Sequence, residues 1–145
     1  MTTLVRRLHG EESGQAIVLV AILMVGLVAV VGLVTDGGLV FSQRRDLQNV
    51  ADAAALAGAM QIDEGVYRAS GEVMLNEPAA RQATVEYLEA EDGVSYSVVV
   101  GPAQVEVSVS RQASTGFLRV VGINGVEISA TASAQPRHGV ASAAP

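Results

Sequence analysis

An uncharged run of twenty residues, 16–35, constrains this chain more than any other feature. It reads AIVLVAILMVGLVAVVGLVT, without Pro and with almost nothing but Ile, Leu, Val, Ala and Gly. As an α-helix rising about 1.5 Å per residue, the run spans roughly 30 Å, the thickness of the hydrocarbon core of a bilayer. A strand would be shorter, and a buried helix of a small soluble domain would show a polar face. We therefore predict a transmembrane helix over residues 16–35.

A cleaved secretory signal is the competing interpretation of the same run. Such a signal has an apolar core of about 7–15 residues that leads into a small-residue cleavage site. This run is longer and ends in Thr35-Asp36-Gly37-Gly38, and the nearest Ala-x-Ala tripeptides lie downstream, within residues 51–59. The pattern favours an anchor that the mature protein keeps.

The segment after the anchor continues with helical periodicity. Apolar residues recur at helical spacing through 39–60, and the stretch is rich in Ala, the best helix former. Residues 63–76 mix Gly, Ser and acidic residues and predict a loop. Asn76-Glu77-Pro78 then marks the start of a second helix, which we expect to end near Gly93.

Beyond Gly93 the apolar period changes to two. The segments 94–100, 105–110 and 126–131 alternate apolar and polar residues, which predicts three half-buried strands. Residues 117–123 leave two alternatives open. Asn124-Gly125 indicates a tight hairpin preceded by a strand, whereas the same residues also fit a short apolar helix after a Ser/Thr cap.

These segments together predict an α+β fold: a long N-terminal transmembrane helix, a second helix and a small antiparallel sheet of about three strands. The expected organisation is a cytoplasmic leader (1–15), the transmembrane helix (16–35), a helix continuing from the anchor (36–62), an extracytoplasmic helix-plus-sheet domain (63–135) and a flexible tail (136–145).

Composition narrows the function classes. The net charge is −6 and the excess acid lies after the anchor, which argues against nucleic acid as a partner. The chain has no Cys, so disulfides, thiolate metal sites and Cys nucleophiles are excluded. Its two His residues, His9 and His138, lie on opposite sides of the anchor. We expect no catalytic residues, no metal or other cofactor and no small-molecule substrate, and hence no enzyme.

Orientation in the membrane follows from the flanks of the run. Arg6 and Arg7 precede it and Arg44 and Arg45 follow it, so the count of positive charges is nearly balanced. The short N-terminal flank and the acidic segment after the run favour a cytoplasmic N-terminus and an external C-terminal domain.

Several motifs resemble a known family. ESGQ at 12–15, GLVTDGG at 32–38 and RRDLQNVADAAALAGA at 44–59 resemble the TadE/TadG-like proteins of the Tad (Flp) pilus assembly system, as do TGFLRVVGI and VEISATASA within 105–134. The chain looks closer to the TadG-like branch. The resemblance implies a pilin-like layout, with a long helix packed on a small sheet, and favours the short-helix alternative for 117–123. It also implies a bacterial inner-membrane component of an adhesive pilus or its secretion apparatus, with other subunits as partners.

Two groups of candidate residues follow. Gly14 and Gln15 are the candidate leader-processing site, but members cut by a prepilin peptidase carry Glu five residues after the Gly, where this chain has Leu19. That departure weighs against a filament subunit. The candidate packing or interaction residues lie at the end of the anchor and on the helix after it: Asp36, Leu47, Gln48, Val50, Asp52, Ala54 and Ala57.

Asp36 lies where the run leaves the membrane, and the family has an Asp at the matching place, so we expect a structural or topological role for it. The alternative function is a single-pass anchored extracytoplasmic binding module unconnected with pili. In that case the exposed face of the sheet, with residues such as Glu106 and Arg111, would bind an envelope polymer or another protein.

Overall fold

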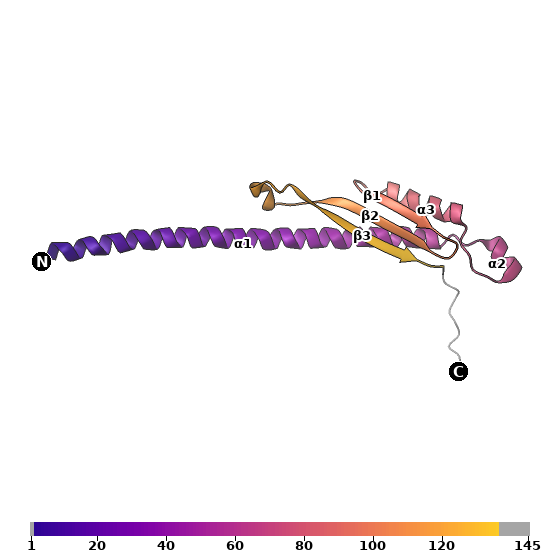
Figure 1. The fold of residues 1–145 in the computed structure, drawn as a ribbon, viewed down its shortest axis with the longest axis horizontal. Helices are drawn as coiled ribbons and strands as arrows, with labels where there is room; N and C mark the ends of the chain where they lie inside the picture. The colour runs from indigo at the N-terminus through magenta and orange to yellow at the C-terminus, as the bar shows by residue number, and fades with distance from the viewer. Residues whose placement is uncertain (1, 137–145) are drawn as a thin grey trace, which may run out of the picture. The chain divides into compact units, whose positions relative to one another are not determined.

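The structure is a computed structural model that describes residues 2–136, with side chains from Gly14 onward apart from Val121. The predicted tail from 137 on, including His138, and the side chains of the leader lie outside the described residues. The elements follow the predicted order of a long helix, a second helix and a sheet, with one further short helix between the first two (Figure 1).

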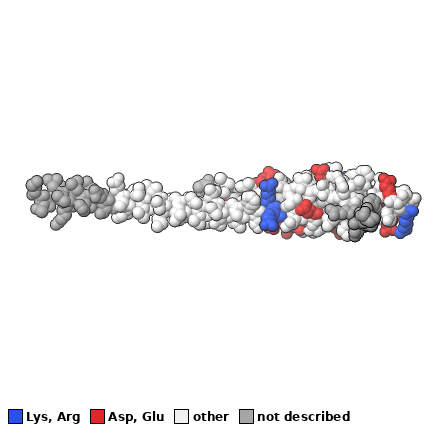
Figure 2. Space-filling model, turned by 90° about the horizontal axis from the view of Figure 1, so that it is seen from below, with Lys and Arg blue, Asp and Glu red and all other residues white. Residues whose placement is uncertain are grey.

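Helix α1 extends over Thr2–Ala59 and does not break at Gly37-Gly38. Nothing packs against either glycine, so their main effect is to lower the helical propensity of this stretch. The Ala-rich sequence that follows raises the propensity again. The helix is long and apolar enough to cross a membrane, judged by length and composition. The large apolar side chains from Ile17 to Val34 are 53% to 71% exposed, and the described part of the run shows no charged surface in the view of Figure 2.

Helix α2, Glu64–Ser70, lies where the sequence predicted a loop, so that prediction is wrong. The Asp63 carboxylate accepts the N–H groups of Gly65 and Val66 at 2.9 and 3.0 Å, which caps the helix start. Gly71 ends the helix in the left-handed region, at φ +75°. The loop interpretation gave weight to the glycines and overlooked the capping Asp.

Helix α3, Glu77–Glu89, confirms the second predicted helix. The Asn76 side chain accepts the N–H of Ala79 at 3.2 Å, and Pro78 occupies the first turn, where a missing N–H is tolerated. The helix ends four residues before Gly93, the predicted stop, and buries Ala80, Thr84 and Leu88.

The three predicted strands are confirmed as one antiparallel sheet in the order β1-β2-β3: Ser95–Val100, Val105–Ser114 and Gly125–Ala134. Val107 pairs with Val98 on one side and with Ala132 on the other. Period-two alternation turns Val105, Val107 and Val109 inward and leaves Glu106 and Ser108 outside. Residues 118–121 form the 3₁₀-helix η1, Leu118–Val121, which agrees with the short-helix alternative.

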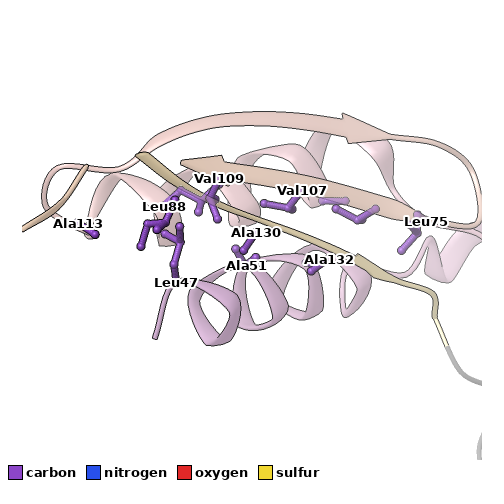
Figure 3. Close-up of a cluster of buried hydrophobic side chains, with 14 residues drawn as sticks. Leu47, Ala51, Leu75, Leu88, Val107, Val109, Ala113, Ala130 and Ala132 are labelled. Atoms are coloured by element: carbon purple, nitrogen blue, oxygen red, sulfur yellow. The ribbon is translucent and has the colours of Figure 1, made fainter. Parts of the chain in front are cut away.

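The main core lies between the inward face of the sheet, the C-terminal part of α1 and α3 (Figure 3). It is built mostly from small residues, so the elements approach closely. Gly58 is an example, since a Cβ placed there would lie 3.1 Å from the Ala80 carbonyl oxygen and would meet Thr84 Oγ1. The observed α+β layout is the predicted one.

The chain divides into two compact units. The apolar-helix unit comprises α1 up to Leu39 together with residues 115–124, the segment that joins β2 to β3. The sheet unit comprises residues 40–114 and the chain from Gly125 onward.

Candidate functional site

The apolar-helix unit is organised around one buried carboxylate. Asp36 is only 1% exposed, and its side chain accepts three consecutive backbone N–H groups. Oδ1 accepts from Gly116 at 2.9 Å and Phe117 at 3.1 Å, and Oδ2 accepts from Leu118 at 2.6 Å. Asp36 thereby performs the task of an N-cap residue for η1, although it comes from another element some eighty residues earlier.

These hydrogen bonds decide the electrostatics of the carboxyl group, which lies just after the uncharged run. The Leu118 N–H has the largest effect and holds the pKa of Asp36 below its ordinary value. Burial acts in the opposite direction, and the N–H groups of Phe117 and Gly116 add to the lowering. The carboxylate therefore stays ionised while shielded from water.

A close contact one turn earlier on α1, at Gly32, also holds the segment 115–124 against the helix. A Cβ at Gly32 would lie 2.7 Å from Phe117 Cγ and 2.9 Å from Phe117 Cβ, so the Phe117 side chain rests directly on the bare helix backbone. Only a residue without a side chain leaves this space. Gly32 and Asp36, four residues apart on one helix face, together hold the segment 115–124.

Hydrogen bonds within the segment 115–124 also stabilise it. Thr115 Oγ1 donates to the Ile123 carbonyl oxygen at 2.5 Å and closes the base of the loop. The sequence suggested a Ser/Thr cap for a helix here; instead, Thr115 closes the loop and Asp36 supplies the cap. Gly122, at φ +90°, ends η1 with its N–H on the carbonyl of Arg119.

Most of the candidate packing residues lie in the sheet unit. Leu47 and Ala54 are fully buried in the core of the chain itself, with Val50 packed against that core. Gln48 is half-buried, and its amide donates to the Thr131 carbonyl oxygen at 3.1 Å and to Asp52 Oδ1 at 3.2 Å. These contacts join α1 to β3.

The remaining candidates point elsewhere. Asp52 is exposed and Ala57 is half-buried, and Gly14 and Gln15 lie exposed within α1. The opposite side of α1 from the core carries an exposed stripe with i, i+4, i+7 spacing, of which the sequence candidates included only Asp52: Arg45, Asn49, Asp52 and Leu56. Another subunit can reach this stripe without displacing the sheet.

Among the described residues, no group of three or more His, Asp or Glu side chains is placed to hold a metal ion. The acceptor atoms of Asp36 are taken up by peptide N–H groups. What the arrangement does chemically is to fix backbone, by buried hydrogen bonds and small-residue contacts.

Comparison with known proteins bears on the helix that carries these features. Residues 14–61 match the family model described as "Putative Flp pilus-assembly TadE/G-like". The match covers 48 of the 145 residues and includes Asp36, Leu47 and the exposed stripe. The Tad description covers the TadE-like and TadG-like branches together and names pilus assembly rather than a catalytic activity.

The Tad match ends two residues after α1, so the sheet and the segment 115–124 lie outside it. No curated protein and no solved structure matches the chain. The match and the apolar helix fit a component of pilus assembly.

Proposed function

We propose that this protein is a single-pass, membrane-anchored assembly component of a Tad (Flp) type pilus or its secretion apparatus. The observation that carries the proposal is the Tad match over residues 14–61, which falls on a helix that is apolar and exposed in its first half and packed on a sheet in its second. The anchor would lie in the bacterial inner membrane, with the N-terminus in the cytoplasm and the sheet unit outside.

The exposed stripe of α1 is the surface that we assign to partner subunits. Leu47 and Ala54 serve the core of the chain itself, which leaves the opposite side of the helix for contacts between subunits. Leu56 is 57% exposed there, flanked by Asn49 and Asp52. An apolar residue among polar ones suits a subunit contact that forms after each chain has folded.

Photo-crosslinking in native membranes tests the proposal. A photoreactive residue at Asn49, on the stripe, should yield adducts with Tad pilus or secretion proteins, identified by mass spectrometry. The same residue at Val99, which is exposed on β1 away from the stripe, is the matched control. Failure to recover any pilus or secretion component from position 49 would argue against the assignment.

The intact mass of the protein from native membranes decides between two forms of this role. A chain that begins at Gln15 would mean peptidase processing without the usual Glu, and would favour a minor subunit of the filament. A chain that keeps residues 1–14 would favour a permanent anchor in the assembly machinery. Leu19 at the position of the usual Glu makes the second form our proposal.

One observation favours a binding module as the second candidate. The outward face of the sheet carries hydroxyl side chains on all three strands, and a shallow depression lies among them: Ser95, Ser97, Ser108, Ser110, Ser129 and Thr131. Glu106 lies on this exposed face. Arg111 is half-buried and pairs with Ile128 on the inward side, so it was wrong to expect it there. Ser108→Arg would fill the depression and should abolish polymer binding while sparing membrane assembly, if this candidate is right.

A further inference from the structure

The segment 115–124 exposes a cluster of apolar side chains. Val120 is 86% exposed, Phe117 49% and Ile123 45%, all within seven residues of chain. Apolar side chains gathered on so short a segment mark an interaction site, because isolated surface apolar residues are ordinary and clusters are not. The question is what covers them.

The position of the segment on α1 answers it. Phe117 rests on Gly32, and Gly32 lies three residues before the end of the uncharged run at Thr35. At 1.5 Å per residue, the contact lies about 4–5 Å inside the end of the run. If residues 16–35 cross the bilayer, as the proposed function requires, the apolar side chains of the segment lie at the level where hydrocarbon meets headgroups.

Many backbone N–H groups of the segment already have hydrogen-bond partners within the protein, as a position next to lipid requires. Lipid tails offer no hydrogen-bond partners, so a segment near them must satisfy its own N–H and C=O groups. Asp36 takes three N–H groups, and carbonyls within the segment take three more. The six N–H groups bonded in this way belong to Gly116, Phe117, Leu118, Val120, Gly122 and Ile123.

The one charged residue of the segment also suits a position at the membrane surface. Arg119 is exposed within η1, between Leu118 and Val120. An arginine at this depth extends its apolar stem along the lipid and places its guanidinium among the headgroup phosphates.

We propose that residues 115–124 form a second, interfacial membrane anchor, in which Phe117, Val120 and Ile123 enter the leaflet that α1 leaves at Thr35. Arg119 binds headgroup phosphate. The partner is the lipid itself rather than a protein, and Asp36 and Gly32 fix the segment to the helix at the depth where it can reach the lipid.

Tryptophan fluorescence tests this directly, because the chain has no Trp. The full-length Val120→Trp variant is reconstituted into phosphatidylcholine vesicles whose acyl chains carry bromine, a contact quencher, either near the headgroup or near the bilayer centre. Val25→Trp, in the middle of the run, is the inserted control, and Val99→Trp, exposed on β1, is the control outside the bilayer. Ile123→Trp gives a second reporter in the segment.

We expect the emission of Val120→Trp and Ile123→Trp to lie at shorter wavelength than that of Val99→Trp. Lipids that carry bromine near the headgroup should reduce the emission intensity of both variants. Val25→Trp should be quenched by bromine near the bilayer centre, and Val99→Trp by neither. If Val25→Trp is quenched but position 120 behaves like position 99, the interfacial anchor is disproved and the transmembrane helix stands. A blue shift at 120 without bromine quenching would mean that protein covers the segment, which also overturns the proposal. If Val25→Trp is not quenched, the helix does not span and both proposals fall.

Discussion

Asp36 Oδ2 accepts the backbone N–H of Leu118 at 2.6 Å, across 82 positions of sequence. Through this bond and its two companions, a side chain at the end of the apolar run decides where the connection between β2 and β3 lies. The strength of these three bonds therefore determines how firmly the connection is held to α1.

Asp36→Asn should loosen the segment 115–124. The amide keeps the size of the carboxylate but presents its own N–H groups toward one of the backbone donors, so at least one bond is lost and the others lose their charge. Trypsin cleavage after Arg119 should accelerate by roughly tenfold, the order expected for a charge-assisted bond. Asp52→Asn, the same change at an exposed site on the same helix, should leave the rate unaltered.

Acid should release the segment only at unusually low pH. Because the folded pKa of Asp36 lies below the unfolded value, its contribution is complete above the unfolded pKa and is lost as pH falls through the folded one. The amide proton resonance of Leu118 should thus titrate with a midpoint below the ordinary Asp value of about 3.9. A midpoint at or above that value would contradict the hydrogen-bonded carboxylate.

Gly32→Ala should displace Phe117. The added methyl would lie under 3 Å from three atoms of that side chain, including Phe117 Cβ, which cannot swing away without moving the backbone. We expect overpacking worth about 1–3 kcal/mol at this contact, seen as faster cleavage after Arg119. Gly26→Ala, in open surroundings within the same run, should show no such effect. Phe117→Ala should rescue the Gly32→Ala variant.

Gly58→Ala should weaken the packing of α1 on α3. The methyl would meet Thr84 Oγ1 and lie 3.1 Å from the Ala80 carbonyl oxygen, both in the core. A loss of about 1–3 kcal/mol in the free energy of unfolding is expected, measured by thermal or urea unfolding in detergent. Gly38→Ala is the control, since nothing lies near its Cβ position. Equal stability of the two variants would contradict the close approach of the helices.

Leu47→Ala and Leu56→Ala separate the two faces of α1. Leu47 is fully buried, so its truncation should reduce unfolding free energy by about 2–5 kcal/mol. Leu56 is exposed, so its truncation should spare folding and instead reduce crosslinking from position 49 to pilus components. Loss of crosslinking only in variants that also lose stability would remove the assignment of the stripe to partners.

Local patterns predicted most of the fold because they are read within a few residues. The apolar run, the Asn76-Glu77-Pro78 start of α3 and the period-two strands each depend on neighbours in sequence, and each was found. Helix α2 was missed because Gly65 and Ser70 outweighed the capping Asp63, although that signal was also local.

The site itself could be predicted only in part. Asp36 stood out as a charge next to an apolar run, but nothing near it in sequence indicates that its partners are Gly116, Phe117 and Leu118. A pairing over eighty residues is decided by tertiary structure. The inward position of Arg111 was missed for a simpler reason, since strand alternation from Val109 would have placed it correctly.

The distance in sequence between Asp36 and Leu118 also has a consequence in time. At about 5–20 residues per second, a ribosome needs about 4–16 s to add the residues between them. During that interval the backbone N–H groups that Asp36 accepts in the folded chain do not yet exist. If the run inserts into a bilayer, as we propose, an unpaired carboxylate at this position resists transfer into lipid and would set the end of the inserted helix. Its capping of η1 follows later, which makes the attachment of the segment a closing event in biogenesis.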